Sequence, residues 1–219
     1  MNGRHAPDME GFELGTPALV CRWRLARRRL PLENRHLRAL LARTVNERPV
    51  SQALVAWAKQ HIEWTLEEGS AEHPDGVLML IIDDNDRAAM TAGPYQPLED
   101  ARLAALARRA RRAQVEASTT GIAPETLWLV IDDELVWNPG EGCAASGAAS
   151  LVVQLAQTIG IPVRREDELL ERVAYSELTY DEAFLVSDEH GIVVAEDAAG
   201  PYGRRFAEGY ERLRQSTRG

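Results

Sequence analysis

The sequence has few of the features that mark a membrane protein, a disulfide framework or a zinc site. No stretch approaches the roughly 18 uninterrupted apolar residues of a membrane-spanning helix, and the N-terminus carries no apolar signal core. The two cysteines, Cys21 and Cys143, are far apart and lack the spacing of metal ligands. We therefore expect a cytoplasmic protein with no membrane partner, no metal site and no disulfide.

Basic residues are fewer than acidic ones: the chain has 25 lysines and arginines and 34 aspartates and glutamates, for a formal net charge of −9. A nucleic-acid partner requires basic side chains gathered on one face, where they displace counterions. Arginines do cluster in residues 24–30 and 108–112, and we interpret both runs as solvated faces. No nucleic-acid partner is expected.

The chain does have enough apolar content, 45% of its 219 residues, to fill two cores of modest size. Residues 1–17 carry little apolar periodicity, and we expect them to form a loose leader. Residues 93–100 hold two prolines and a glycine within five positions, which cannot continue a helix or a strand. We interpret this segment as a linker between an N-terminal lobe, residues 18–92, and a C-terminal lobe, residues 101–219.

Both lobes mix the periodicities of helices and strands, which predicts an α+β fold. In the first lobe, strands are expected at residues 18–25 and 76–83, and helices at 31–45 and 51–68. Arg22 and Arg24 lie on one face of the first strand. In the second lobe we expect helices at residues 101–117, 150–160, 166–178 and 201–215, a hairpin at 126–139 turning at Asp132 and Asp133, and strands at 182–188 and 191–195.

A small-residue turn, "GEGCAASGAAS", precedes the second helix of the second lobe. Small side chains allow backbone N–H groups to approach an anion, and the positive end of the helix dipole favours one. Ser146, Gly147 and Ala148 are therefore candidate anion-binding residues. Simple capping of the helix is the alternative, and it is the favoured interpretation of this turn taken alone.

The order of motifs resembles the class IV aminotransferases, the fold-type IV pyridoxal-phosphate (PLP) family that includes branched-chain aminotransferases and aminodeoxychorismate lyase. "LPLENRHLRALL" is similar to a first-lobe segment of that family, and "LTYDEAFLVSD" to a second-lobe strand that follows the turn and its helix. The resemblance implies a two-lobe fold, here shortened, with a cleft between the lobes. It also implies a homodimer.

The departures from the family concern the residues that hold PLP. The family's Schiff-base lysine lies just after the linker, whereas the only lysine here, Lys59, lies well before it. The resemblance places the family's phosphate-binding arginine at Ala39 and its phosphate-binding threonine at Ala149. The carboxylate that holds the pyridine nitrogen has no clear counterpart, because neither Glu116 nor Glu125 has the expected spacing. These departures predict a homologue that does not use PLP.

We therefore expect the inter-lobe cleft to bind a small anionic metabolite, either in a binding protein or in an enzyme with changed chemistry. Arg22, Arg24, Ser146, Gly147, Ala148 and Ser187 are the candidate ligand-binding residues; the resemblance places a further phosphate contact near Ser187, whereas Arg22 and Arg24 also fit as surface charges on an edge strand. No catalytic residue is assigned, and Cys143 is only a weak candidate, because a helix N-terminus can lower a thiol pKa. The alternatives are a scaffold with a vestigial pocket and a PLP-dependent lyase or aminotransferase.

Overall fold

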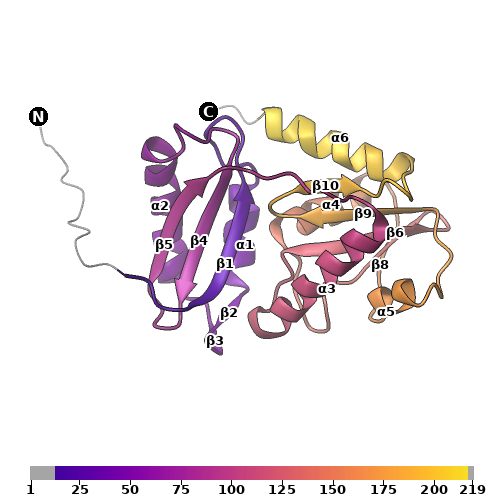
Figure 1. Cartoon of the computed structure of the whole chain (residues 1–219), viewed down its shortest axis with the longest axis horizontal. Helices are drawn as coiled ribbons and strands as arrows, with labels where there is room; N and C mark the ends of the chain where they lie inside the picture. The colour runs from indigo at the N-terminus through magenta and orange to yellow at the C-terminus, as the bar shows by residue number, and fades with distance from the viewer. Residues whose placement is uncertain (1–12, 217–219) are drawn as a thin grey trace, which may run out of the picture.

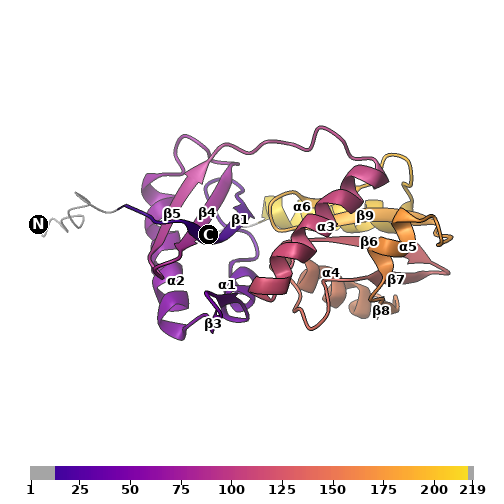
Figure 2. The same cartoon turned by 60° about the horizontal axis from the view of Figure 1, so that its bottom comes forward.

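The computed structural model describes residues 13–216, which form two α/β lobes side by side (Figure 1). Most of residues 1–17, the expected leader, therefore lies outside the described residues. The linker runs across both lobes between the first sheet and the first helix of the second lobe (Figure 2). None of the helices between residues 13 and 216 combines the length and apolarity needed to cross a bilayer.

The first lobe is an antiparallel sheet with two helices on one face. Its strands, in the order β1-β4-β5, are β1 (Pro17–Arg24), β4 (Val77–Asp83) and β5 (Ala88–Gly93). Cys21 and Trp23 pair with Leu80 and Leu78 and point into the core beneath the helices. The intervening residues of β1, including Arg22, therefore belong to the opposite face.

Two helices cover this sheet, α1 (Glu33–Leu41) and α2 (Gln52–Glu68). The predicted helix over residues 51–68 is confirmed, and the Ser51 hydroxyl accepts a hydrogen bond from the Leu54 N–H at 3.1 Å as its N-cap. The helix predicted over 31–45 ends earlier. Asn46 and Glu47 take positive φ angles of 51° and 62° in a tight turn that joins the short strands β2 (Thr44–Val45) and β3 (Arg48–Pro49).

The second lobe is a five-stranded sheet between two helical layers. Its order is β10-β9-β6-β7-β8, with only the β7–β8 pair parallel. The strands are β6 (Glu125–Ile131), β7 (Glu134–Trp137), β8 (Val163–Arg165), β9 (Glu182–Ser187) and β10 (Gly191–Val194). The predicted hairpin is confirmed, and Asp132 and Asp133 form its turn with φ angles of 50° and 63°.

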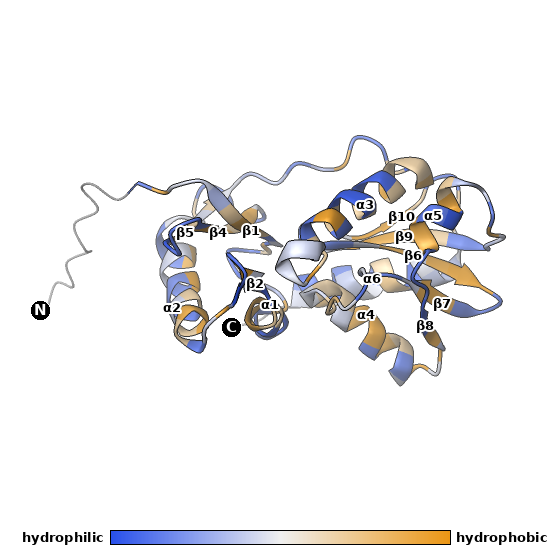
Figure 3. Ribbon diagram, turned by 90° about the horizontal axis from the view of Figure 1, so that it is seen from below, coloured by the Kyte–Doolittle hydropathy of each residue, from blue (hydrophilic) through white to orange (hydrophobic). Residues whose placement is uncertain are grey.

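Both faces of the second sheet are buried. Figure 3 shows that its strands, which lie between the helices, are largely apolar. One face packs on α3 (Leu103–Thr120) and α5 (Leu169–Ala174), and the other on α4 (Gly147–Thr158) and α6 (Pro201–Ser216). The helix expected over 166–178 is thus only six residues long. Phe206 and Tyr210 of α6 are buried. The strands β2, β3, β5 and β8 were not predicted from the sequence pattern.

Candidate functional site

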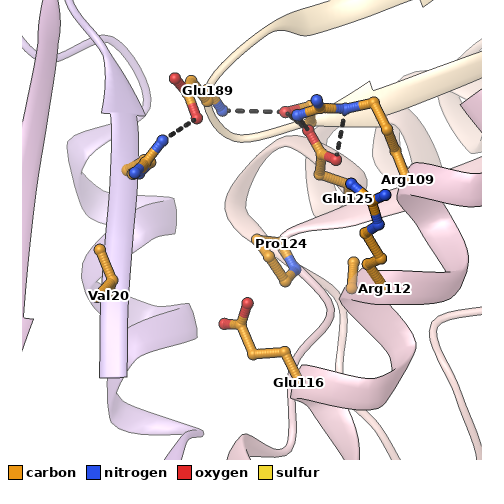
Figure 4. A pocket seen from close by; sticks show the side chains of 10 residues that line it. Val20, Arg109, Arg112, Glu116, Pro124, Glu125 and Glu189 are labelled. Atoms are coloured by element: carbon orange, nitrogen blue, oxygen red, sulfur yellow. Dashed lines mark hydrogen bonds and ion pairs between the residues drawn. The ribbon is translucent and has the colours of Figure 1, made fainter. Parts of the chain in front are cut away.

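A cleft lies between the two lobes, where β1 faces α3 and the end of β9 (Figure 4). Its volume is about 370 Å³, and a neighbouring hollow of about 420 Å³ under the linker shares Arg22, Arg109, Arg112 and Glu189 with it. The two hollows therefore form one continuous cleft. The first is lined by Val20, Arg22, Arg109, Arg112, Ala113, Glu116, Pro124, Glu125, Ser187 and Glu189.

One carboxylate of the cleft, that of Glu125, is fully engaged by neighbouring side chains. Arg109 binds it with both arms of its guanidinium, at 2.8 and 2.9 Å. The Ser187 hydroxyl donates a third hydrogen bond to Glu125 Oε1 at 3.0 Å. Since Arg109 neutralises it, Glu125 does not repel an anion from the cleft.

The segment that follows β9 closes the upper end of this network. Ser187 Oγ accepts the backbone N–H groups of Glu189 and His190, at 3.2 and 3.0 Å. The His190 ring lies between Arg109 Nη2, at 2.9 Å, and the Tyr95 hydroxyl of the linker, at 3.3 Å. Burial lowers the pKa of His190, with nearby Glu189 and Glu125 acting in the opposite direction. The linker thus takes part in the site.

Three arginines of the cleft have free donor capacity: Arg22, Arg112 and, in the second hollow, Arg108. Arg22 comes from β1 and meets Glu189 only at 3.5 Å, with 54% of its side chain exposed. Arg112 comes from α3 on the other side, and within residues 13–216 it has no hydrogen bond or ion pair. Glu116 points into the cleft and pairs with Arg43 at 3.4 Å; burial raises the pKa of Glu116, against the effect of Arg43.

Arg24, the second predicted arginine of β1, is held elsewhere. Its guanidinium carbon lies 3.2 Å from the centre of the Tyr95 ring, and burial lowers the pKa of Arg24. Its Nε is buried without a hydrogen-bond partner in the described part of the chain. Arg24 is therefore not among the residues that line either hollow, although it supports Tyr95 beside His190.

The predicted anion turn, Ser146, Gly147 and Ala148, is buried and lines neither hollow. Ser146 Oγ caps α4 by accepting the Ala149 N–H at 3.3 Å. The Ala148 N–H donates to the carboxylate of Asp188 at 2.8 Å. The N-terminus of α4 is thus satisfied by a serine cap and by an anion that belongs to the chain itself.

Asp188 is fully buried, and its carboxylate lies 3.7 Å from His36 Nδ1. Burial alone would raise the pKa of Asp188, but His36 and the Ala148 N–H together hold that pKa below its ordinary value of 3.8. The aspartate is therefore ionised at neutral pH.

The remaining candidates lie outside the cleft. The Cys143 thiol is within 3.6 Å of the Ala117 carbonyl and borders a separate hollow of about 620 Å³ near the β2–β3 hairpin. Burial raises the pKa of Cys143, against the effect of Arg165, and so favours the unreactive thiol. Lys59 is exposed on α2 and is not among the residues that line the cleft. Residues 13–216 contain no cluster of three or more His, Cys, Asp or Glu suited to a metal ion.

Sequence reasoning missed most of the cleft. Arg109 and Arg112 belong to the run interpreted as a solvated face, and Glu116 follows on the same helix. A signal was present, because the buried residues of α3 form a stripe and these three charges flank it at helical spacing. That stripe consists of Leu103, Leu106, Ala110, Ala113 and Ala117.

No family model and no curated protein matches the sequence. Solved structures do match the fold. A 4-amino-4-deoxychorismate lyase from Pseudomonas aeruginosa is 15% identical with a TM-score of 0.55, covering 91% of this chain and 90% of its own. A hypothetical aminotransferase from Mycobacterium tuberculosis in its PLP-bound form is 14% identical, with a TM-score of 0.61 and coverages of 100% and 95%. The branched-chain amino acid aminotransferase from Escherichia coli is 15% identical, with a TM-score of 0.58 and coverages of 92% and 88%.

The chain therefore has the two-lobe α/β fold of these enzymes. At 14–15% identity the likeness concerns the fold alone. The chemistry has to be argued from the side chains of the cleft.

Proposed function

We propose that this protein is a PLP-independent homologue of the class IV aminotransferases that binds a small metabolite carrying a carboxylate or phosphate in the cleft between its lobes. The observation that carries the proposal is the free donor capacity of Arg112, with Arg22 on the facing strand. A guanidinium offers a fork of N–H donors that matches carboxylate and phosphate oxygens. The homodimer that the resemblance implies remains a prediction.

Two contacts that PLP would need, an amine for its aldehyde and free N–H groups for its phosphate, support independence from the cofactor. PLP supplies an aldehyde that must form an imine with an amine, and Lys59 is exposed on α2 rather than on the cleft. Its phosphate would need free N–H groups at a helix N-terminus, and at α4 Ser146 and Asp188 already accept from Ala149 and Ala148. The residues present do not fit the cofactor.

Binding, rather than a particular reaction, is what the geometry supports best. Glu125 and Arg109 neutralise each other, and Glu116 is paired with Arg43. A ligand anion between Arg22 and Arg112 would therefore meet donors without displacing either of these pairs. The ligand would weaken the ion pair between Glu189 and Arg22. Because the two side chains are 3.5 Å apart and Arg22 is exposed, losing this pair costs little free energy.

Thermal unfolding in the presence of small carboxylates and phosphate esters tests the proposal, because a ligand of the folded state raises its midpoint. We expect Arg112→Ala to weaken binding of any stabilising compound about 10- to 100-fold, the equivalent of roughly 1.5–3 kcal/mol for a charged hydrogen bond. Arg111→Ala is the matched control, since Arg111 lies on the same helix and pairs with Glu171 outside the cleft. Equal affinities of Arg112→Ala and wild type, or no response to either class of compound, would reject the cleft as the site.

A further inference from the structure

The N-terminus of α4 faces a carboxylate that belongs to the chain itself, the side chain of Asp188. Asp188 follows β9, 40 residues further along the chain, and its Oδ1 accepts the Ala148 N–H at 2.8 Å. Free N–H groups and the helix dipole make such a position favourable for any carboxylate or phosphate. Here the carboxylate is 4% exposed, so it has no bulk water to share the charge.

A second observation comes from the other lobe. His36 of α1 is 2% exposed, and its Nδ1 has no hydrogen-bond partner within residues 13–216. That atom is aimed at the same place, 3.7 Å from the second carboxylate oxygen of Asp188. The ring stacks on Trp23 with centroids 5.3 Å apart, which fixes its orientation. A buried ring nitrogen without a hydrogen bond needs an explanation, and the ion pair with Asp188 supplies one.

The space around the carboxylate is fitted closely. A Cβ on Gly147 would lie 2.4 Å from His36 Nδ1, so only glycine allows the ring this close to the helix end. The backbone of Asp188 is engaged as well, since its carbonyl accepts the Arg24 N–H and its N–H donates to the Pro124 carbonyl, both at 3.1 Å. One residue thus contacts α1 and β1 in the first lobe and α4 in the second.

We propose that Asp188 is an internal ligand: its carboxylate occupies the anion site formed by the N-terminus of α4 and His36, and in doing so ties the two lobes together. The neighbours of Asp188 in sequence, Ser187 and Glu189, both line the cleft. Asp188 is therefore a positioning residue that sets the two walls of the cleft. This inference does not depend on what the cleft binds.

Chemical rescue tests the proposal. Asp188→Ala removes three heavy atoms, and formate ion supplies the same three atoms as a free anion. We expect Asp188→Ala to lower the unfolding midpoint by roughly 6–20 °C, as for loss of one partner of a buried charged pair. Sodium formate restores part of that loss, whereas sodium chloride at equal ionic strength does not. Asp188→Asn is the matched control, because its amide keeps the space filled and excludes formate.

Formate can also bind in the cleft. The measurement is therefore repeated on the double variant that carries both Asp188→Ala and Arg112→Ala. Rescue that survives this substitution belongs to the α4 site, whereas rescue that disappears with it belongs to the cleft and overturns the proposal. Equal responses of wild type, Asp188→Ala and Asp188→Asn to formate also overturn it. If Asp188→Ala does not fold, Asp188→Asn decides: we expect a lower midpoint than wild type, and an unchanged midpoint contradicts the proposal.

Discussion

Two buried aspartates lie where strands end, Asp83 as the last residue of β4 and Asp188 just after β9. The carboxylate of each accepts backbone N–H donation from outside its strand. Asp83 accepts from Gly15 at 2.7 Å, Arg87 at 2.8 Å and Asn85 at 2.9 Å. Burial acts to raise the pKa of Asp83, but these N–H groups and the Arg87 side chain lower it to about 2. The segment 83–86 is therefore organised around one inward carboxylate.

Acid should weaken the fold through Asp83. Because its folded-state pKa lies below the ordinary value of 3.8, its contribution to stability is complete above that value and is lost as the pH falls toward about 2. We expect Asp83→Asn to unfold at a lower temperature than wild type at neutral pH, and the difference to shrink below about pH 4. Thermal unfolding from neutral pH to pH 2 measures this. Asp84→Asn, at the exposed neighbouring position, is the control. A difference in unfolding temperature between Asp83→Asn and wild type that stays constant with pH would be inconsistent with the prediction.

The candidate ligand residues show how far single positions can be predicted. Alternation along β1 placed Arg22 outward, and it lines the cleft together with Ser187. Arg24 lies on the same face of β1, but the Tyr95 ring of the linker covers it. The α4 turn has the composition of an anion site, yet its anion is Asp188, which no local pattern connects to Ala148. Contacts between distant segments decide which candidates face solvent.

At the scale of elements, long periodic segments were predictable and short ones were not. The residues of α2 and α3 repeat their apolar positions over many turns, and the helices lie where that repeat predicts them. The strands β2, β3 and β8 span two or three residues each, too few to show alternation. The sequence of β5, AAMTAG, lacks the bulky side chains typical of strands and is held by its pairing with β4.

Strand β9 connects the two helices of one layer through acids at its ends. Glu182, its first residue, accepts the N–H groups of Tyr202 and Gly203 at 3.0 and 2.8 Å and so caps α6. Asp188, just past its last residue, does the same for α4. The layer is thus oriented by charge as well as by apolar packing.

Two helical glycines give a test of the close fit between α1 and α4. In Gly147→Ala, the new methyl group would meet the His36 ring at 2.4 Å, and we expect a loss of roughly 1–3 kcal/mol in the free energy of unfolding. In Gly209→Ala on α6, nothing lies within 4 Å, and we expect a gain of about 0.5–1 kcal/mol. Urea unfolding measures both, and a stabilised Gly147→Ala would show that the helices are not packed as described.

At the scale of the whole molecule, the order of elements predicted the fold and the departures from the family motifs did not predict a substrate. TM-scores of 0.55 to 0.61 with enzymes of this class confirm the two-lobe architecture. The reason for the difference is physical. Many sequences satisfy the apolar periodicity of one fold, whereas a ligand is chosen by a few side chains whose neighbours come from both lobes.

The absorption spectrum of the protein as purified, before and after borohydride reduction, tests most directly whether the cleft works without PLP. A lysine-bound PLP absorbs at long wavelength, and reduction removes that band while fixing the pyridoxyl group to the amine. We expect no such band, and an unmodified mass for the peptide that contains Lys59, the only lysine. A band that disappears on reduction, with a pyridoxyl group on Lys59, would contradict a PLP-independent protein.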